Sequence, residues 1–451
     1  MTPSMIHTYS SDFINTSSRE YAIYSAQNRA IPSSCDGLKD GQRKALWVIR
    51  NRTEKIKTVS LSGDMLAANV YLHGDSSASE TISRLAAPYL NNRPLLEGIG
   101  AFGTRVAPDG WGAPRYTYVK RNKTTEALVY PDLDIVPLKP NYDGSVLEPA
   151  NFLPLIPLVL LNGISGIAVG WSTEILPHSL RSIVAATAAA IDGKPIPELI
   201  PSFDNMTVGV NKLAENSYEF SGRVEIEGDS LVRVTELPPD LSLERFKTRL
   251  NQLEDEDQIH SYTDRSTKTI NIEIRFKRGT VKSWTEQDAI NWLKLKSKTT
   301  QRLVVLDFNN SSIRQYDNTA DLIKAFVQWR LGYYTVRFNK EIESLRRDLA
   351  FAQAVKACVA ARLPQWLPTA RTKQDVEQKV RTITKGIPLD DSQLERIVGF
   401  PSYRWAQDSI ARIDEEIASL TTKIGELEAL LNNPQAIRAV YKREVQALAA
   451  L

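Results

Sequence analysis

Residues 410–431, IARIDEEIASLTTKIGELEALL, carry a regular apolar repeat that determines the architecture of the last third of the chain. Isoleucine or leucine recurs at alternating intervals of three and four residues. The positions are Ile410, Ile413, Ile417, Leu420, Ile424, Leu427 and Leu431. Such alternation forms the a/d seam of a coiled coil. A plain helical bundle is the alternative, and the strict alternation weighs against it.

A second helix, expected over about residues 320–362, supplies a partner for this seam. It carries one apolar stripe and ends before Pro364 and Pro368. The stripe consists of Phe338, Ile342, Leu345 and Leu349. Two seams separated by a compact insert predict an antiparallel coiled-coil hairpin with a small domain at its tip. This part of the chain therefore divides into an ascending helix (316–364), a tip domain (365–402), and a return helix followed by a terminal helix (403–451).

Upstream of the long helices the pattern changes from a helical to a strand period. Residues 201–312 contain alternating stretches such as VEIEGDSLVRV and TINIEIRF, which are typical of half-buried strands. Residues 62–200 are rich in glycine and proline between short apolar runs, which favours a mixed α/β module. The fold class predicted from these patterns is α+β with several domains.

Residues 17–57 read as a helix, a turn at Asp36-Gly37 and a second helix. The second segment, RKALWVIRNRTEKIK, carries many cations against one acid, Glu54, with Leu46, Trp47 and Ile49 as a buried face. This pattern is typical of a helix-turn-helix DNA-binding surface. A solvated charged face explains the same run equally well, and the segment alone leaves both interpretations open.

Composition excludes several classes of protein. The 451 residues include 56 basic and 53 acidic side chains, so any affinity for nucleic acid must come from local clusters of charge. Two distant cysteines, Cys35 and Cys358, exclude a disulfide framework and favour a reducing, cytoplasmic setting. The N-terminal residues lack the pattern of a secretory signal. The scattered histidines have no zinc-ligand spacing, and no phosphate-binding P-loop occurs, so ATP would be bound by another chain.

One stretch imitates a membrane span. Phe152 to Trp171 is 20 residues long and carries no charge, which meets the length criterion for a transmembrane helix. Pro154, Pro157 and several glycines interrupt it, however. We therefore expect short buried strands and turns here, and no membrane partner.

Three motifs around Tyr116 resemble a known family. RAIPSSCDGLKDGQRKAL, YLHGDSSASETISRLA and EGIGAFGTR…APRYTYV resemble the R-A-[LI]-P…D-G-L-K-P segment, the H-G-[DE] helix and the G-x-G-N-F-G…R-Y-[TI] region of type IIA DNA topoisomerases. PNYDGSVLEP, LLNGISGIAVGWSTEILPHSL, TELPPDLSLERFKTRL and LKLKSKTTQRLVVLDFNN follow in the family's order. Over its whole length the chain resembles the breakage-reunion part of these enzymes (the gyrase A and topoisomerase IV A core), and most closely the medium subunits of the T-even-phage type.

The resemblance implies a domain order. Residues 1–150 would form a winged-helix DNA-gate domain with the active-site tyrosine, and residues 151–315 a tower or shoulder domain. The tip of the long antiparallel coiled coil would be the distal dimerisation domain, and the terminal helix would complete an exit gate.

The resemblance also implies catalytic roles. Tyr116 is expected to attack a DNA phosphodiester and form a 5′-phosphotyrosyl bond, with Arg115 stabilising the charge that builds on the phosphate. His73 is expected either to polarise the same phosphate or to relay the proton. For Tyr116 taken alone, a core aromatic residue is the alternative.

Further residues match the family's DNA-binding positions. Arg29, Lys39, Arg43 and Lys44 are expected to hold the DNA backbone, and Ile167 to wedge between base pairs and bend the duplex. Gln42 and Tyr71 stand where many bacterial relatives have histidine, so proton-relay details of those relatives do not transfer. Ser76 and Glu80 match possible drug-contact positions.

The resemblance places the cofactors on another chain. Mg²⁺ would be held by a Toprim domain, and both this domain and the ATPase are expected on a large partner subunit. The tetrapeptide E-G-D-S in Glu225–Val232 imitates a Toprim motif, but its context favours a strand of the shoulder domain. We expect no metal ligands on this chain, a homodimer within a heterotetramer or larger assembly, and location in the cytoplasm, that of the bacterial host if the chain is phage-encoded.

The resemblance finally implies the reaction. The chain would be the cleaving and religating subunit of an ATP-dependent topoisomerase that passes one duplex through another and so relaxes or decatenates replicating DNA. Two other functions compete. A non-catalytic DNA-binding scaffold would share the basic helix and the coiled coil. A tyrosine recombinase would carry its nucleophile near the C-terminus, which the position of Tyr116 disfavours.

Overall fold

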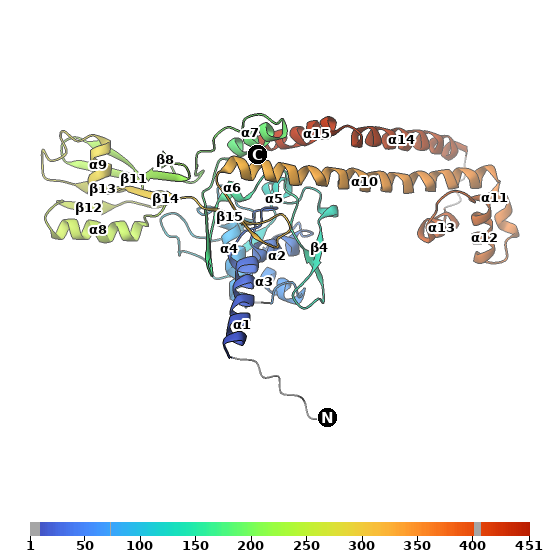
Figure 1. Ribbon diagram of the computed structural model, residues 1–451, viewed down its shortest axis with the longest axis horizontal. Coiled ribbons are helices and arrows are strands. Elements are labelled where there is room, and N and C mark those ends of the chain that lie inside the picture. The colour runs from blue at the N-terminus through green and yellow to red at the C-terminus, as the bar shows by residue number, and fades with distance from the viewer. Residues whose placement is uncertain (1–9, 73, 401–406) are drawn as a thin grey trace, which may run out of the picture. The chain divides into compact units, whose positions relative to one another are not determined.

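The computed structural model describes residues 10–72, 74–400 and 407–451, and the chain divides into two compact units (Figure 1). The first unit comprises Met1–Arg330 with Lys442–Leu451, and the second comprises Leu331–Tyr441. Each unit has its own buried core. The candidate site lies in the first unit.

The N-terminal part of the first unit combines helices with a small antiparallel sheet. The helices are α1 (Ser10–Ser25), a π-helical turn (Ala26–Ala30), α2 (Asp40–Ile49), α3 (Thr58–Ala67) and α4 (Asp75–Ala86). The sheet has the order β1 (Ile56–Lys57), β3 (Tyr118–Lys120), β2 (Glu97–Ile99). Strand β3 begins two residues after Tyr116, so the sheet fixes the chain on the C-terminal side of this residue.

The predicted helix, turn and second helix are confirmed, with corrected boundaries. The turn lies at Asp36-Gly37, where Gly37 has φ +69° and a Cβ would stand 2.3 Å from the backbone nitrogen of Val159. Helix α2 begins at Asp40, because the Gln42 side chain accepts a hydrogen bond from the Lys39 backbone at 2.9 Å. The expectation of helix through residue 57 is wrong: the helix ends at Ile49, and the residues before α3 pair as β1 with β3.

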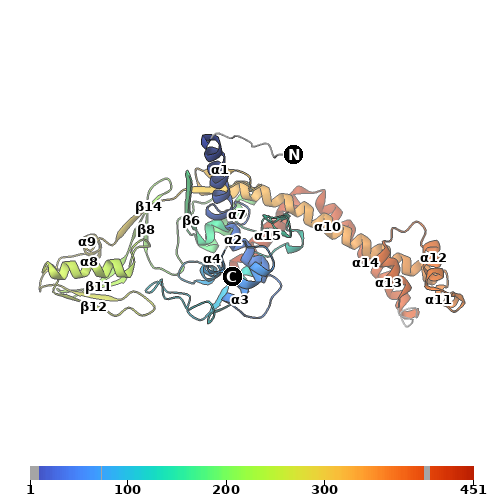
Figure 2. The same ribbon diagram turned by 90° about the horizontal axis from the view of Figure 1, so that it is seen from below.

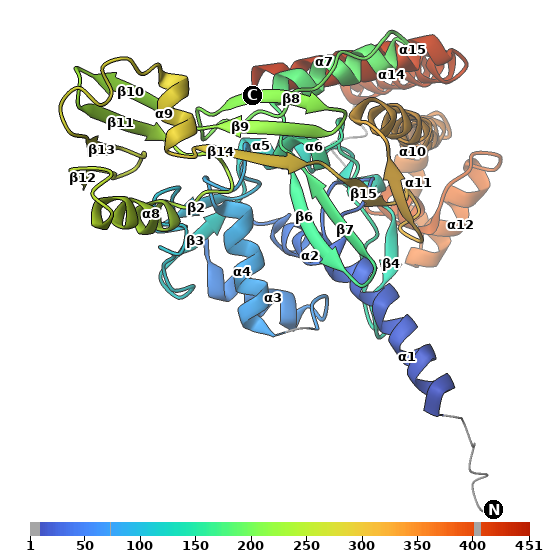
Figure 3. The ribbon, with the colours of Figure 1, turned by 60° about the vertical axis from the view of Figure 1, so that its left-hand side comes forward.

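The stretch that imitated a membrane span folds as a buried loop and a hairpin. Residues 152–157 are buried without regular structure, α6 covers Val159–Asn162, and β6 (Ile164–Ala168) pairs with β7 (Trp171–Ile175). The expected short strands and turns are thus confirmed, but their expected burial is wrong for β6, whose residues are partly or fully exposed. Within the described ranges, no helix is long and apolar enough to cross a membrane. Figure 3 shows β6 and β7 as a hairpin beside the end of α1.

Shorter elements surround this hairpin in the first unit. They are α5 (Lys123–Leu128), a 3-10 turn (Leu133–Ile135), β4 (Leu138–Pro140) paired with β5 (Leu147–Pro149), and α7 (Leu180–Ile191). Strand β15 (Leu303–Leu306) pairs with β16 (Ile313–Tyr316) as a hairpin. This hairpin contacts the segment before α2 through an isolated β-bridge between Ser33 and Leu306.

The β-rich region predicted over residues 201–312 is confirmed; we call residues 209–300 the shoulder module. One sheet has the order β14 (Lys296–Thr300), β9 (Ser217–Ser221), β8 (Gly209–Ala214). The other has the order β10 (Arg223–Glu227), β11 (Leu231–Glu236), β13 (Ile272–Arg275), β12 (Ser261–Asp264). Helices α8 (Leu243–Asp255) and α9 (Glu286–Trp292) pack on the second sheet and enclose a core of aliphatic and phenylalanine side chains (Figure 2). The Toprim-like tetrapeptide forms the turn of the β10–β11 hairpin and not the predicted strand.

The second unit contains the long helices and the tip. Helix α10 (Thr319–Ala360) enters it from the first unit, and α14 (Gln407–Leu431) runs back along α10. The two helices are antiparallel, as two ion pairs between them show: Arg346–Glu428 and Lys356–Asp414, both at 2.6 Å. The tip elements are α11 (Leu363–Trp366), a 3-10 turn (Leu367–Thr369), α12 (Lys373–Ile383) and α13 (Asp391–Val398). Helix α15 (Pro434–Ala447) and a 3-10 turn (Leu448–Ala450) return to the first unit.

Apolar residues of both predicted seams are buried within this unit, among them Ile342, Ile413 and Leu420. The side chain of Ile410, the first residue of the seam, lies outside the described residues. The antiparallel pair expected from the two periodicities is therefore present, whereas the coiled-coil packing itself stays a prediction.

Candidate active site

Tyr116 projects from the surface next to a buried neighbour. Its side chain is 68% exposed, whereas Thr117 is 2% exposed. The Thr117 carbonyl accepts a hydrogen bond from the Thr58 backbone at 3.0 Å, and the two threonine hydroxyls lie 2.8 Å apart. Tyr116 itself ends a turn, because its backbone donates to the Ala113 carbonyl at 2.8 Å. The exposure of the Tyr116 ring at this turn rules out the core-aromatic alternative.

Arg115 stands beside the phenol ring. Its guanidinium carbon is 4.7 Å from the centre of the Tyr116 ring. Arg115 also lines a cavity of about 570 Å³ at the start of α4, together with Ser76 and Glu80. A planar, permanently charged guanidinium next to an exposed phenol suits a phosphate ligand. Arg115, which is expected to act on the phosphate, thus lines one cavity with Ser76 and Glu80, the expected drug contacts.

The segment before Tyr116, Ala101–Arg115, is a loop closed at its base. The Gly112 backbone donates to the Ala101 carbonyl at 2.9 Å, and Phe102 bridges to Trp111. Gly103 has φ +75°, and a Cβ there would be 2.7 Å from the indole nitrogen of Trp111. Only glycine fits that position without moving its neighbours. We call residues 101–116 the tyrosine loop.

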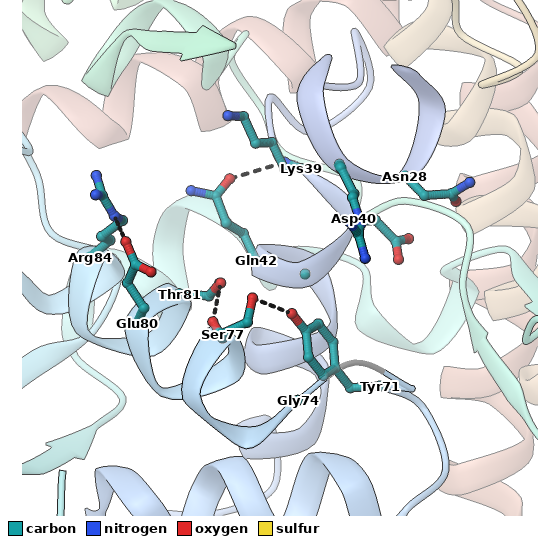
Figure 4. Close-up of a pocket in the computed structure, with 12 residues that line it drawn as sticks. Asn28, Lys39, Asp40, Gln42, Tyr71, Gly74, Ser77, Glu80, Thr81 and Arg84 are labelled. Atoms are coloured by element: carbon teal, nitrogen blue, oxygen red, sulfur yellow. Dashed lines mark hydrogen bonds and ion pairs between the residues drawn. The ribbon is translucent and has the colours of Figure 1, made fainter. Parts of the chain in front are cut away.

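A second cavity, of about 620 Å³, lies on another side of α4 (Figure 4). Arg29, Lys39 and Arg84 line it, with Glu80 paired to Arg84 at 2.9 Å. Its polar lining also includes Gln42, Tyr71, Ser77 and Thr81, and the carboxylate of Asp40, which is paired with Lys44. Burial, and secondarily the charge of Arg84, lowers the pKa of Lys39. Converging cations and neutral donors are the lining that a phosphate backbone requires. Glu80 lines both cavities, so α4 connects them.

Arg43 and Lys44 do not face this cavity as free cations. Arg43 is buried and binds Asp36 through two nitrogens, at 2.7 and 2.9 Å. Lys44 contacts Asp40 at 2.9 Å and Glu148 at 3.1 Å. Removing a buried cation from its carboxylate is costly. The expectation that Arg43 and Lys44 contact DNA directly is therefore not supported by their placement, because interior carboxylates already neutralise them.

The Asp40 carboxylate of this network is held in its charged form. Burial alone would raise the pKa of Asp40, but Lys44, Arg43 and Lys139 outweigh it and keep that pKa below its ordinary value. Asp36 also accepts hydrogen bonds from the backbone of Leu38 and of Phe152. The network therefore fixes the start of α2, and with it Lys39.

The β6–β7 hairpin presents Ile167 to solvent. Ile167 is 86% exposed, although it is an aliphatic residue in a paired strand. The Lys39 ammonium donates to the Ser165 carbonyl at 2.7 Å, which joins the hairpin to α2. A Cβ on Gly166 would stand 2.1 Å from the Ala30 carbonyl oxygen, so glycine permits this close approach. An exposed aliphatic residue on a fixed hairpin is suited to insertion between bases.

His73 lies outside the described residues. His178 is buried, and burial lowers its pKa to about 4, so it remains neutral and belongs to the core. Cys35 and Cys358 are buried free thiols. Within the part of the chain that the structure describes, no three His, Cys, Asp or Glu side chains come together as metal ligands.

Sequence reasoning missed Arg84 as part of the second cavity. Its spacing of four residues from Glu80 on one helix was a signal of pairing. The spacing could not reveal that this pair borders the space next to Lys39. That proximity requires α2 and α4 to pack together.

Comparison with known proteins agrees with this geometry. The family model that describes the A-type subunits of DNA gyrase and topoisomerase IV matches residues 29–446. The DNA topoisomerase medium subunit of Enterobacteria phage T4 is 29% identical over 418 residues, which cover 89% of this chain and 91% of that protein. Human DNA topoisomerase 2-alpha is 33% identical over 345 residues, which cover 72% of this chain but 22% of that protein.

A solved structure shares the fold. The DNA-binding, cleavage and re-ligation domain of Plasmodium falciparum topoisomerase II aligns with a TM-score of 0.85 at 22% identity, covering 97% of this chain and 64% of that one. This similarity confirms the predicted mixed α+β, multidomain fold. The chain thus spans nearly all of the phage relative, but 22% of the length of the matching topoisomerase 2-alpha proteins.

Proposed function

This chain belongs to the family of A-type subunits of DNA gyrase and topoisomerase IV, and from that premise we propose that it is the subunit of a type II DNA topoisomerase that cuts and rejoins duplex DNA. The observation that carries the proposal is the exposed Tyr116 phenol with the Arg115 guanidinium beside it. Cations next to α4 support a DNA backbone as the ligand.

The chemistry exchanges one phosphodiester for another. The Tyr116 oxygen attacks the phosphorus, the bond from phosphorus to the 3′-oxygen breaks, and the 3′-oxygen takes up a proton while the phenol loses one. The phenol of a free tyrosine is almost entirely protonated at neutral pH, so the attack needs help. Arg115 donates to the non-bridging oxygens as their charge grows. Because the two bonds are similar in energy, the 3′-hydroxyl reverses the attack and reseals the strand. His73 either polarises the phosphate or relays the proton.

The DNA path is supported by the residues around α4. We assign backbone contacts to Arg29 and Lys39, and insertion between base pairs to Ile167, which would bend the duplex. We assign Arg43 and Lys44 the indirect role of holding the start of α2. Ser76 and Glu80, which border the same cavity as Arg115, are the proposed drug contacts.

The finer architecture belongs to the same proposal. We assign α2, α3, α4 and the β1–β3–β2 sheet to a winged-helix domain within residues 1–150, and residues 151–315 to the tower or shoulder domain. Residues 316–364 and 403–451 would form the coiled coil and terminal gate helix, and residues 365–402 the dimerising tip. Two copies would present two tyrosines to opposite strands, so that a second duplex passes through the opened gate.

The remaining parts of the enzyme are proposed to lie on a partner chain. Mg²⁺ would be held by the partner's Toprim domain and ATP by its ATPase domain, and the two chains would form a heterotetramer or larger assembly. The expected outcome is ATP-dependent relaxation or decatenation of replicating DNA, in the cytoplasm of the bacterial host if the chain is phage-encoded.

The test is covalent trapping. The chain is mixed with its partner subunit, Mg²⁺ and supercoiled plasmid and stopped with denaturant, and the DNA end that carries protein is mapped. We expect protein on 5′ ends in both strands. The variant Tyr116→Phe should bind DNA as the wild type does and form no adduct, and Tyr142→Phe, another exposed tyrosine, is the matched control. Absence of any adduct with the wild-type chain supports a scaffold instead, and attachment to 3′ ends supports a recombinase. Unchanged cleavage by Tyr116→Phe means that another residue is the nucleophile.

A further inference from the structure

We propose that Arg105 is a positioning residue for Tyr116: it attaches the tip of the tyrosine loop to the shoulder module and so keeps the phenol where it attacks. This inference rests on the proposed function. It concerns a residue at the far end of the loop from the reacting atoms.

Arg105 makes its contacts to the backbone of another module. One terminal nitrogen donates to the carbonyl oxygens of Leu237, Pro238 and Leu241, at 3.2, 2.8 and 3.2 Å. These carbonyls lie in the turn between β11 and α8. The Arg105 side chain is 17% exposed, and the Glu236 carboxylate lies 3.8 Å from its Nε. A half-buried guanidinium with charge-assisted bonds to carbonyls is a specific attachment.

The next residue strengthens the attachment. Val106 packs against the core cluster of the shoulder module, which contains Phe246 and Leu250 of α8. The tip is turned so that both side chains reach the module, because the Thr104 backbone donates to the Ala107 carbonyl at 3.0 Å. Charge-assisted bonds and apolar burial therefore act at one point.

The path from this attachment to Tyr116 is short and internally bonded. The Tyr89 hydroxyl donates to the Pro108 carbonyl at 3.0 Å, and the Trp111 indole donates to that hydroxyl at 3.4 Å. The Gly112–Ala101 hydrogen bond then closes the loop ahead of Tyr116. A displacement of the tip is therefore carried to the base rather than absorbed by a slack chain.

The attachment matters because the loop has few other strong interactions. In the described structure, Arg105 is the one member of the tyrosine loop whose side chain is paired with a carboxylate. The other hydrogen bonds of the loop are neutral, each contributing about 1 kcal/mol. Misplacing a reacting group by about 1 Å can cost about 100-fold in rate. Loss of Arg105 should therefore affect the chemical step more than DNA binding.

The test measures adduct formation on an oligonucleotide duplex whose scissile 3′-oxygen is replaced by sulfur, so that resealing is suppressed. The full chain is assayed with Mg²⁺ and its partner subunit. For Arg105→Ala we expect the rate at saturating DNA to fall about 10- to 100-fold, with the half-saturating DNA concentration within about twofold of wild type. Arg105→Lys keeps the positive charge but lacks the planar guanidinium, so its rate of adduct formation should lie between those of Arg105→Ala and wild type.

Arg249→Ala is the matched control. Arg249 lies in α8 of the same module and donates to the Trp292 carbonyl at 3.3 Å, but it does not touch the tyrosine loop. It should cleave within about twofold of wild type. If Arg105→Ala cleaves like wild type, or if Arg249→Ala loses as much activity as Arg105→Ala, the positioning role is wrong.

Amide hydrogen exchange tests the inference without DNA chemistry. In Arg105→Ala, amides of residues 98–117 should exchange about tenfold faster, while those of α2 and the β6–β7 hairpin are unchanged. Unchanged exchange in the tyrosine loop overturns the inference. If the wild-type assembly forms no 5′ adduct, the proposed function fails instead, and the exchange measurement still decides whether Arg105 holds the loop.

Discussion

Two loops border helix α4, and they are stabilised by opposite means. The first, which we call the Asp36 loop, comprises residues 33–44 and so includes the start of α2. It is held by buried ions: Arg43 binds Asp36, and Lys44 contacts both Asp40 and Glu148. The tyrosine loop is held by neutral backbone hydrogen bonds, by glycine geometry and by Arg105 at its tip. The first loop positions Lys39 at the proposed DNA backbone site, and the second positions Tyr116.

This difference in stabilisation means that one loop mainly affects the stability of the fold and the other mainly affects the cleavage reaction. Breaking a buried ion pair costs several kcal/mol, so the Asp36 loop acts as a rigid frame. Away from the Arg105 attachment, the tyrosine loop can change shape at lower cost, because each of its neutral hydrogen bonds contributes about 1 kcal/mol. Changes in the first loop should therefore lower the free energy of unfolding, and changes in the second should lower the rate of cleavage.

The largest effect is expected at Asp36. Asp36→Ala removes the carboxylate that binds the Arg43 guanidinium and leaves a buried charge, so the free energy of unfolding should fall by about 3–5 kcal/mol. Urea denaturation followed by circular dichroism measures this. Asp64→Ala, which breaks the exposed Arg52–Asp64 pair, should cost about 0–1 kcal/mol. Equal losses for the two variants would remove the distinction between the loops.

Arg115→Ala is expected to lower the rate instead. Loss of the guanidinium beside the phenol should reduce adduct formation about 100- to 1,000-fold, the usual cost of one transition-state donor, with an unchanged melting temperature. Lys120→Ala, which removes a cation of β3 paired to Glu97, should cleave within about twofold of wild type. Quenched-flow sampling of covalent complex gives the rates. If Arg115→Ala lowered the melting temperature and left cleavage unchanged, the tyrosine loop would contribute to stability and not to the rate of cleavage.

Gly103→Ala should affect both properties moderately. A side chain at φ +75° is strained by about 1–2 kcal/mol, and its Cβ would also crowd the carbonyl oxygen of Pro108 at 2.8 Å. We expect slower cleavage and a slightly lower melting temperature. Gly63→Ala in α3, where the added Cβ meets open space, should be neutral or stabilising by up to about 1 kcal/mol. Similar cleavage by both variants would show that loop geometry does not control Tyr116.

The smallest expected effect is a loss of folding stability at low pH. The pKa of Asp40 is depressed in the folded chain, so its contribution to stability is present above the ordinary value of 3.8 and is lost as pH falls through the folded pKa. The free energy of unfolding should decline below about pH 4 in the wild type and less steeply in Asp40→Asn. Urea titrations between about pH 2 and pH 6 test this. Parallel curves would mean that Asp40 does not contribute to the frame.

Local patterns predicted the elements whose signal is carried by neighbouring residues. The long helix α10, the seam of α14 and the strands around Val232 and Ile272 follow from periodicity, because backbone geometry alone sets which residues share a face. The motif order around Tyr116 identified the family. The predicted end of the second helix at residue 57 was wrong, because Ile56 forms a strand by pairing with Val119, a residue far along the chain.

The sequence by itself determined the class of fold and the family, because each depends on residue type and order, and it predicts Tyr116 as the nucleophile. Tertiary structure alone decided which cations are neutralised. Arg43 and Lys44 appear basic in the sequence, yet packing brings Asp36 and Glu148 to them and cancels their charge. Arg84 and Arg105 acquire roles only because distant carbonyls and side chains meet them. Electrostatic interaction depends on distance in space and on burial, and neither is written in the order of residues.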